Sequence, residues 1–538
     1  MNVGSGLSLA IALSGFVGAA LMGPDRLHSG RAQRGSPFDI RRPSQPPPGR
    51  RISPPSPRGP QRRRDGGARH GRQATARWAT PRDMRALVIA DGKHNGAPPV
   101  GRLVLGRVRK RLVASERAQS VIVFGPTQSH KTSGFAVPAI LGWQGPVIAA
   151  SVKTDLLEHT FEHRRSCGSV AVFDPSGSTG MESVRWSPLP RSRTWPGARR
   201  AAAGLTEVAK ASVGTMVDGD FWYATAAKML APLLFAAAVG GRDMHDVVRW
   251  VDTHEETEVV DLLSAAGVVE ALHVAQSTFG KEDRQRSSIY TTVETILQPF
   301  ADEVPADDDT PAGTVLEPGG LIDGAHTLYL CAPAHDQRRL TPLFVSVVRE
   351  VVEHVYDLVA RTRRPIDPPL LVVLDEAANI APLSDLDALA ATAAGHGVQL
   401  VTIWHDLAQI TARYGPRATT VVNNHRAKLF LSGISDPSTL DYASHLIGEE
   451  EVVLPSTTSG GQGGPSTTRS PSTRRLAPPD GLRRIAPGDG VLVYGDLPPA
   501  RLRLRTWFDD PVLLDRICPP PVTPPFGWLR GRRGDDRS

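Results

Sequence analysis

A nine-residue polar segment carries the side chains best suited to hold a phosphorylated ligand. The apolar run Val121–Phe124 leads into it, and a helical stretch follows it. The segment consists of Gly125, Pro126, Thr127, Gln128, Ser129, His130, Lys131, Thr132 and Ser133. It matches the phosphate-binding pattern GxxxxGK(S/T) at every position but one. In such a loop, backbone N–H groups and a helix N-terminus surround the β- and γ-phosphates of ATP, Lys131 adds a positive charge, and the Thr132 hydroxyl binds Mg²⁺.

The one departure from the pattern is His130, which stands at the second glycine. Glycine serves positions that need a positive φ or a close approach of the backbone. Histidine is among the few other residues enriched at positive φ, so we expect the loop to keep its shape at a cost of around 1 kcal/mol. An ordinary strand–turn–helix rich in polar residues is the alternative interpretation of this segment.

Two carboxylates follow another apolar run, since Asp375 and Glu376 come directly after Leu370–Leu374. In P-loop ATPases one such acid holds Mg²⁺ through water, and a second polarises the attacking water. We assign these roles to Asp375 and Glu376, although helix caps are the alternative. Because Lys131 and Asp375 lie 244 positions apart, far more than one βαβ unit, their pairing also requires an inserted domain.

A third strand end supplies a candidate for sensing the γ-phosphate. Leu400–Ile403 is followed by Trp404 and His405. In ATP-driven motor proteins, a polar residue at the end of such a strand senses the γ-phosphate. A helix-capping cluster formed with Asp406 explains His405 equally well. The residues expected to do chemistry are catalytic Lys131, Glu376 and His405, and the Mg²⁺ ligands Thr132 and Asp375.

Short apolar runs rich in β-branched residues recur from residue 80 onward. The expected strands are Val121–Phe124, Val147–Ala150, Val170–Phe173, Leu328–Cys331, Leu370–Leu374, Leu400–Ile403 and Lys428–Leu431. Such strands, separated by helical stretches, predict a mainly parallel sheet covered on both faces. Between Phe173 and Leu328 the chain has Ala-rich amphipathic runs and no clear strand, which predicts an all-α domain inserted into the α/β fold.

The net charge of +7 and the pI near 9.5 come from one segment. Between Arg26 and Arg72, thirteen Arg, no Lys and two acidic residues give +11, which leaves −4 on the rest of the chain. The pI alone therefore gives no reason to expect a core that binds DNA. Residues 41–60 hold eight Pro and two Gly, which predicts a disordered linker. Its arginines either contact anionic lipid or nucleic acid, or are simply solvated.

The amino end has the length and composition of a membrane anchor. Residues 3–22 are uncharged, and about 20 residues just suffice for a transmembrane helix. The arginines that follow would keep the rest of the chain in the cytoplasm. A signal peptide is one alternative, although no basic residue precedes the run, and an unanchored start is another. Further along, Pro455–Thr473 is expected to be a long mobile loop. The three cysteines have neither disulfide nor zinc spacing, which fits a reducing compartment.

Six motifs in a fixed order resemble those of the TraG/TraD-type coupling ATPases of type IV secretion and conjugation. They are GPTQSHKTS, WQGPVIAASVKTDLLEHT, VFDPSG, LDEAANIAPL, GHGVQLVTIWHDLAQITARYG and NNHRAKLFLSG. The resemblance implies a RecA/FtsK-like P-loop NTPase fold, an inserted all-α domain that takes part in substrate recognition, a membrane anchor and a hexameric ring. It also implies that ATP hydrolysis moves relaxase-bound, single-stranded DNA to a transfer channel. By this likeness Lys153 and Asp155 lie beside the nucleotide.

Two further histidines depart from that family's pattern. His396 stands where its members usually carry an arginine that reaches into the adjacent subunit, and His405 stands where a glutamine senses the γ-phosphate. Neutral imidazole can donate one hydrogen bond as glutamine does, but it lacks the permanent charge of an arginine finger, whose removal can cost about 10³-fold or more. Arg338 and Arg339 are candidates to supply that charge, with salt bridging as their alternative role.

These observations predict a membrane-anchored coupling ATPase that uses ATP and Mg²⁺. Its expected partners are DNA, a relaxase, secretion-channel proteins, the membrane and further copies of itself in a hexamer. It is expected to be a single-pass protein of the inner or plasma membrane with most of the chain in the cytoplasm. The expected units are an anchor (1–25), a linker (26–75), a nucleotide-binding domain in two parts (76–199 and 313–515), the all-α insertion (200–312) and a tail (516–538). The alternatives are a nucleotide-binding recruitment platform without turnover and an FtsK-like translocase of double-stranded DNA.

Overall fold

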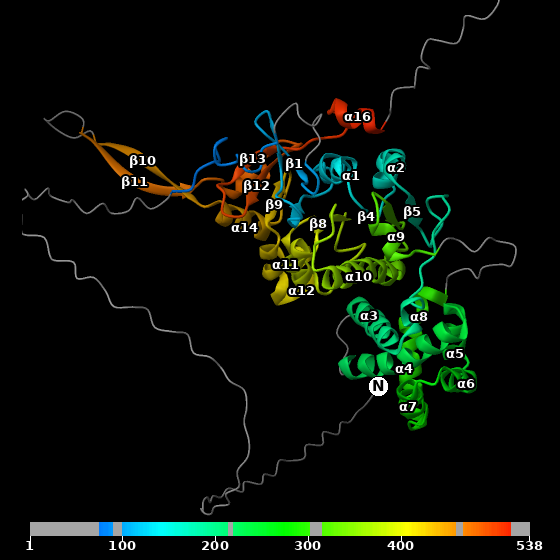
Figure 1. The fold of residues 1–538 in the computed structure, drawn as a ribbon. Helices are drawn as coiled ribbons and strands as arrows, with labels where there is room; N and C mark the ends of the chain where they lie inside the picture. The colour runs from blue at the N-terminus through cyan, green and yellow to red at the C-terminus, as the bar shows by residue number, and fades with distance from the viewer. Residues whose placement is uncertain (1–74, 90–98, 214–218, 302–314, 459–465, 518–538) are drawn as a thin grey trace, which may run out of the picture. The chain divides into compact units, whose positions relative to one another are not determined.

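The computed structural model describes residues 75–89, 99–213, 219–301, 315–458 and 466–517 (Figure 1). The chain divides into two units, and the first, Met1–His70, lies wholly outside this description. The expected membrane anchor and nearly all of the expected linker fall on these undescribed residues. The second unit, Gly71–Ser538, contains the elements described below.

An eleven-stranded mixed sheet forms the centre of this unit, in the order β2-β1-β13-β12-β9-β3-β8-β7-β4-β6-β5. Seven adjacent strands run parallel: β3 (Val121–Phe124), β4 (Val147–Ser151), β5 (Val170–Phe173), β6 (Thr327–Cys331), β7 (Leu370–Leu374), β8 (Val398–Trp404) and β9 (Ala427–Leu431). Four strands continue the sheet by antiparallel pairing: β1 (Val104–Val108), β2 (Arg111–Ala114), β12 (Asp489–Tyr494) and β13 (Ala500–Arg503). This is the α/β architecture expected of a P-loop NTPase.

Each of the seven expected strands lies within one of the parallel strands, and β3, β5 and β7 match to the residue. All of them except β5 are buried along their full length, which explains their nearly continuous apolar sequence. None of the four antiparallel strands is among the strands expected from the sequence. Arginines interrupt the apolar pattern in β1, β2 and β13, whereas β12 has the same apolar signal as the parallel strands.

Helices pack on both faces of the sheet. One face carries a turn of π-helix, η1 (Thr132–Ala136), with α1 (Val137–Gly142), α2 (Asp155–Cys167) and α16 (Pro511–Ile517). The other carries α9 (Pro318–Ile322), α10 (Gln337–Thr362), α11 (Leu386–His396), α12 (Leu407–Tyr414), α13 (Ala418–Asn424), α14 (Pro437–Ile447) and α15 (Pro479–Arg483). Two 3₁₀ turns are η2 (Arg191–Arg193) and η3 (Gly415–Arg417). Alternate residues of β3 face the two cores, Val121 and Val123 one of them, and Ile122 and Phe124 the other.

Six consecutive helices, which precede α9, make up most of the described chain between β5 and β6. They are α3 (Trp195–Val213), α4 (Gly219–Gly240), α5 (Met244–Asp252), α6 (Thr257–Ala266), α7 (Val269–Phe279) and α8 (Asp283–Ala301), and we call residues 195–301 the helical insertion. Among the described residues of this interval, strand-type pairing is limited to one bridge between Arg185 and Val315. The domain boundaries stay predictions, since α3 begins before residue 200, residues 302–314 are undescribed, and α16 runs past 515.

Helix α4 is long and apolar enough to cross a membrane, and it is the one helix of that kind among the described residues. Its apolar side chains nevertheless form the core of the helical insertion. Met229, Leu230, Leu233 and Leu234 are almost completely buried, and α4 contacts α3, α6, α7 and α8. A helix that is apolar on all sides is expected at the centre of a helical domain, so burial among its neighbours accounts for the composition of α4.

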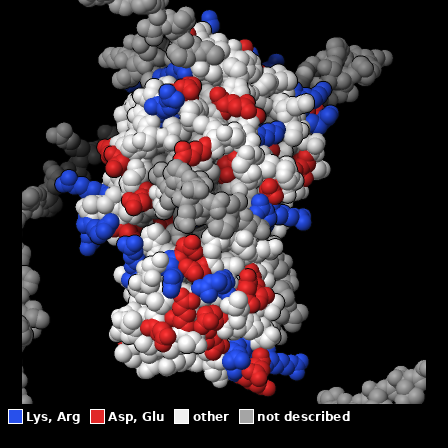
Figure 2. Space-filling view, turned by 90° about the vertical axis from the view of Figure 1, so that its right-hand side faces the viewer, with Lys and Arg blue, Asp and Glu red and all other residues white. Residues whose placement is uncertain are grey.

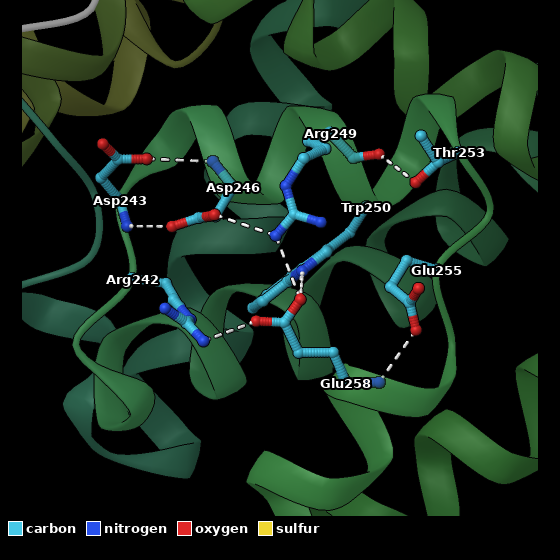
Figure 3. Close-up of polar contacts among 8 residues, drawn as sticks. All are labelled: Arg242, Asp243, Asp246, Arg249, Trp250, Thr253, Glu255 and Glu258. Atoms are coloured by element: carbon cyan, nitrogen blue, oxygen red, sulfur yellow. Dashed lines mark hydrogen bonds and ion pairs between the residues drawn. The ribbon is translucent and has the colours of Figure 1, made fainter.

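The surface of the helical insertion is acidic. Residues 195–301 carry fourteen acidic and nine basic side chains, and Figure 2 shows acidic groups gathered on the lower part of the view, which the insertion forms. Many of the basic groups are paired with them. Glu258 on α6 contacts Arg242 at 2.8 Å, Arg249 at 3.0 Å and the indole N–H of Trp250 at 2.8 Å (Figure 3). This network holds α5 against α6.

Two long strands correct the expectation of a loop at residues 455–473. β10 (Glu449–Thr458) and β11 (Ser466–Arg475) pair antiparallel in register along their whole length. Ion pairs between Glu450 and Arg474 at 2.8 Å and between Glu449 and Arg475 at 3.4 Å close the base of this ribbon. Prolines are tolerated in both strands because each strand of a two-stranded ribbon has an edge whose N–H groups need no partner. A composition of Pro, Ser and Thr therefore does not exclude a strand.

Candidate nucleotide-binding site

A cavity of about 460 Å³ lies at the carboxyl edge of the parallel strands. Parallel strands end at the same edge of a sheet, so the segments that follow β3, β4 and β7 meet there. Its walls consist of Thr127, Gln128, His130, Lys131, Thr132, Ser133, Val137, Ser151, Val152, Lys153, Asp155, His159, Asp375, Glu376, Trp507 and Phe508. The cavity thus brings together most of the expected loop residues, both carboxylates and the Lys153–Asp155 segment.

The loop after β3 has the strained backbone of a tight phosphate-binding turn. Gln128 and His130 have φ values of +65° and +62°, in the left-handed region. The Ser129 hydroxyl donates to the Pro126 carbonyl at 2.8 Å inside the loop. A Cβ on Gly125 would lie 2.4 Å from the Ser129 Oγ, so a larger residue there would displace the hydroxyl that closes the loop. The positive φ of residue 130 explains why the phosphate-binding pattern has glycine at that position and why histidine can replace it.

The His130 ring packs beside the loop. Its Nδ1 lies 3.1 Å from the Ser133 Oγ, and its ring centre is 5.9 Å from that of Phe508. The His130 carbonyl accepts a hydrogen bond from the Gly134 N–H at 2.7 Å, which ties the loop to η1. A π-helical turn of this kind often marks a functional site. These contacts fix the histidine without filling the cavity.

Lys131 supplies a buried positive charge. Its side chain contacts the carbonyls of Gly125 at 3.5 Å and Pro126 at 3.4 Å, both long for hydrogen bonds. Burial lowers the pKa of Lys131, while the carboxylates of Asp375 and Glu376 act in the opposite direction. The ammonium group therefore lacks a strong partner in the loop, and a phosphate would provide one.

Asp375 carries the most perturbed carboxyl group of the cavity. The Thr132 hydroxyl donates to its Oδ2 at 2.8 Å, whereas its Oδ1 is buried without any hydrogen-bond partner. Burial raises the pKa of Asp375 to about 6, while the Thr132 hydroxyl and the charge of Lys131 act against this rise. A buried acceptor without a partner is costly unless a ligand satisfies it. A hydroxyl beside a carboxylate is an oxygen-ligand set that suits Mg²⁺ and its waters.

Glu376 and His405 face each other beside this group. The Nε2 atom of His405 lies 3.9 Å from the Glu376 Oε1, and Glu376 has a left-handed φ of +60°, which is rare outside glycine. Burial lowers the pKa of His405, and the positive charge of Lys131 adds to this effect, so its imidazole is neutral at pH 7. Asp406, one residue further, caps α12 by accepting from the Gln409 N–H at 2.9 Å. Capping therefore explains Asp406, while His405 lies next to the cavity without forming its wall.

Other expected residues lie away from the cavity. His396 ends α11 and precedes β8, so it lies at the opposite edge of the sheet, where its ring stacks on Tyr356 at 3.8 Å. Arg339 contacts Asp336 at 3.4 Å at the start of α10, and the neighbouring Arg338 is exposed. Neither arginine is part of the cavity wall, and none of these three residues reaches the nucleotide site of its own chain.

Two aromatic residues of the cavity are absent from the expectation. Trp507 and Phe508 follow β13, and the backbone N–H of Trp507 donates a hydrogen bond to the Ser133 carbonyl at 3.1 Å. The Trp507 ring lies 4.5 Å from the ring of His159 on α2. These residues close the side of the cavity with apolar surface. No motif marks them in the sequence, since only the fold brings the carboxyl-terminal segment back to β3.

The fold and the cavity define a P-loop nucleotide-binding protein with a mainly parallel sheet. Residues 78–524 match the family described as Type IV secretory system Conjugative DNA transfer. Because this match covers most of the chain, the chain belongs to that family of type IV coupling proteins, which confirms the resemblance found in its motifs.

Individual relatives agree. The chain is 22% identical over 409 residues to the conjugal transfer protein TraG of Rhizobium radiobacter, covering 72% of this chain and 62% of that relative's length. It is 23% identical over 504 residues to TraG of Escherichia coli, covering 83% and 78%. Among solved structures, the plasmid coupling protein TrwB in complex with ADP and Mg²⁺ has the same fold, with a TM-score of 0.56 and 18% identity over 76% of this chain and 95% of that one.

Proposed function

We propose that this chain is a coupling ATPase, which binds and hydrolyses ATP to recruit a relaxase-bound DNA strand and move it toward a type IV secretion channel. The observation that carries the ATPase assignment is the buried Asp375 carboxylate, which is bound on one side by the P-loop hydroxyl of Thr132 and has a free oxygen on the other. The family match and the complex of TrwB with ADP and Mg²⁺ support the same assignment.

The residues of the cavity divide the chemistry among them. Bound Mg²⁺ would neutralise charge on the β- and γ-phosphates, and Thr132 and Asp375 are the residues placed to hold it. Lys131 binds the phosphates as a buried cation. Glu376 orients the attacking water and accepts its proton at a carboxylate oxygen. The neutral His405 donates a hydrogen bond from its imidazole N–H toward the γ-phosphate, as a glutamine would.

Assembly into a homo-hexamer would give His396 a function that it lacks within one chain. It lies at the edge of the sheet opposite its own P-loop, so it could reach a nucleotide only across a subunit contact. An imidazole lacks the permanent charge of a guanidinium group. We therefore expect turnover to be slower than with an arginine at this position.

We also propose that residues 1–25 anchor the chain in the inner or plasma membrane and that residues 26–75 tether the cytoplasmic ATPase. The +11 charge that directly follows the apolar run supports this orientation. Deleting residues 1–72 should release the protein from the membrane fraction and leave nucleotide binding intact. A full-length chain found only in the soluble fraction would contradict the anchor.

The test of the ATPase is steady-state phosphate release with and without single-stranded DNA. Wild-type protein is compared with Lys131→Ala and with Lys110→Ala, a control that removes an exposed lysine outside the cavity. We expect Lys131→Ala to abolish turnover, the control to keep it, and DNA to stimulate it. Nucleotide binding without turnover in the wild type would instead favour a recruitment platform, and stimulation by duplex alone would favour a double-strand translocase.

A further inference from the structure

The strands β1, β12 and β13 lie together on the antiparallel side of the sheet (Figure 1). A second, larger hollow lies at these strands. It has a volume of about 920 Å³ and lies between α15 and the residues around Trp78. We call it the arginine groove, because five of its lining residues are arginines and one is acidic. These are Arg107, Arg109, Arg484, Arg501, Arg503 and Asp489. Apolar side chains such as Leu482 and Ile485 complete its walls.

The strand register places the arginines on one face. Arg107 on β1 pairs directly with Arg503 on β13, which pairs in turn with Asp489 on β12. Directly opposed residues of antiparallel strands point to the same face, so Arg107 and Arg503 lie on one face of the sheet. Arg501 lies two residues before Arg503 on that face, about 6.7 Å along the strand. Arg107 and Arg503 thus extend a row of arginines across β1 and β13, and Arg501 and Arg503 extend it along β13.

This charge arrangement is not explained by the stability of the fold. Like charges directly opposed in a sheet are destabilising. Arg503 is offset by Asp489 at 3.6 Å, in a pair whose side chains are 67% and 40% exposed, and such surface pairs contribute little. Arg107 contacts Asp510 at 3.3 Å, but Arg505 already binds that carboxylate at 2.6 Å. Arg484 pairs with Asp480 at 2.6 Å. The excess of positive charge in the groove therefore rests on Arg109, on Arg501 and on the incompletely neutralised Arg107.

The backbone and an aromatic ring hold the arginines in position. Gly106 has a φ of +145° at an irregularity between β1 and β2, and a Cβ there would lie 2.6 Å from the Arg503 carbonyl oxygen. Only glycine lets β1 approach β13 this closely before Arg107. The guanidinium of Arg501 lies 4.9 Å above the ring of Trp78, a cation–π contact that fixes its plane over the groove.

We propose that the arginine groove is a binding site for the sugar–phosphate backbone of single-stranded nucleic acid, separate from the nucleotide cavity. Guanidinium groups bind phosphate oxygens in pairs of hydrogen bonds, and the row along β13 offers successive groups to successive phosphates. The apolar walls suit the faces of unpaired bases, which a duplex hides. A lipid surface is the poorer match because the charges line a hollow, which a flat bilayer does not enter. The inference rests on the proposed function for the identity of the nucleic acid as the transferred strand.

The test compares two triple variants of the full-length protein in detergent. The groove variant is Arg109→Asn, Arg501→Gln and Arg503→Gln, all exposed side chains, with Asn chosen because residue 109 has a φ of +58°. The control variant, Lys228→Gln, Lys281→Gln and Arg284→Gln, removes the same charge from the helical insertion. Binding of a fluorescein-labelled oligothymidylate is followed by anisotropy, in the absence of nucleotide, between about 50 and 200 mM salt.

We expect the groove variant to bind roughly ten- to a hundredfold more weakly at about 0.1 M salt, with a salt slope lower by about 0.7 for each lost contact. The control variant should keep wild-type affinity, and both variants should keep the wild-type ATP turnover measured without DNA and the wild-type melting temperature. Equal affinity of groove variant and wild type overturns the inference, and so does an equal loss in the control. Loss of binding to anionic vesicles alone, with DNA binding intact, overturns it in favour of a lipid.

The proposed ATPase is judged separately by turnover in the same preparations. A wild type that hydrolyses ATP and binds DNA, beside a groove variant that does both equally well, contradicts the arginine groove alone. A wild type that binds no DNA contradicts both the groove and the proposed coupling function.

Discussion

The polar groups of the candidate nucleotide-binding cavity and those of the helical insertion differ in burial and in pairing. In the cavity Lys131 and Asp375 are buried and incompletely partnered, and the backbone beside them is strained, as the unpaired Oδ1 of Asp375 and the left-handed φ of Glu376 show. In the helical insertion the polar groups are more exposed and bind one another, as Glu258 does with Arg242 and Arg249 (Figure 3). Groups that leave bonding capacity unused are those that can bind a ligand.

This difference bears on Arg284 and Arg286 on α8, two basic residues of the helical insertion that are two positions apart. Their spacing suggests a pair that could straddle a DNA backbone. Arg286, however, contacts Asp283 at 2.9 Å and Glu256 at 3.7 Å, and it donates to the Phe279 carbonyl at 3.0 Å. Only Arg284 remains exposed. Together with the acidic surface around them, these contacts favour a structural role for Arg286 and disfavour contact with DNA.

The largest expected effect concerns the two carboxylates of the cavity. Glu376→Gln should keep Mg-ATP binding and lower kcat by about 10³-fold, because the amide cannot accept the proton of the attacking water. Asp375→Asn should lower turnover similarly, because it removes the buried charge opposite Thr132. Phosphate release and equilibrium nucleotide binding measure the two effects. Turnover close to wild type in both variants would end the assignment of this cavity as the catalytic site.

The second expected effect is a loss of stability of the α/β part at low pH. His425 is fully buried, and burial lowers its pKa to about 4. The unfolded chain takes up a proton near pH 6.5, well before the folded chain does, so stability falls as the pH drops from about 6.5 to 4, by roughly 3 kcal/mol. Urea unfolding at several pH values should show this loss. His425→Gln should reduce it and leave the part that comes from His163, whose pKa burial also lowers to about 4. A pH dependence unchanged in that variant would show that other groups cause it.

A third effect tests the aromatic wall of the cavity. Trp507→Ala should raise the Kd for ATP about tenfold, because the loss of one aromatic contact is worth about 1 kcal/mol or somewhat more. Trp507→Phe should keep most of the affinity, and kcat should change little in either variant. Equilibrium binding with a fluorescent ATP analogue gives the comparison. Equal affinities in all three proteins would show that the wall does not touch the nucleotide.

The smallest expected effect lies in the helical insertion. Arg286→Ala should lower the free energy of unfolding by about 0.5 kcal/mol, because exposed ion pairs contribute little. It should leave single-strand binding at the wild-type level, measured by the same anisotropy assay as the groove variants. A clear loss of DNA affinity without loss of stability would restore the interpretation of α8 as a DNA contact.

The parallel strands and the residues at their ends could be predicted from the sequence because burial on both faces leaves a local signal. An apolar run followed by a polar turn marks β3 and β7, and the P-loop pattern identifies the first of these turns. β1 and β13 could not be predicted in this way. Their arginines belong to a face that only the pairing of distant strands creates.

The remaining parts of the site depend on contacts between segments far apart in the chain. Trp507 reaches the P-loop because β13 and α16 return to it, and nothing near residue 507 indicates this. The ribbon of β10 and β11 could not be predicted for another reason. Its strands bury little, so pairing and ion pairs at its base replace the apolar pattern that predicts strands elsewhere.

The position of the helical insertion in the strand order also has a consequence for biosynthesis. β3 pairs with β8 and β9, β4 with β6 and β7, and β5 with β6, so every partner of these three strands follows the insertion in sequence. At about 5–20 residues per second, a ribosome needs roughly 15 to 55 s to travel from Val121 to Val398. Once the ribosome has passed α8 and before it reaches Thr327, the nascent chain holds three apolar strands without their sheet neighbours, while α3–α8 are already complete. We expect the insertion to fold first, and nascent chains that stop before residue 327 to depend on chaperones or aggregate.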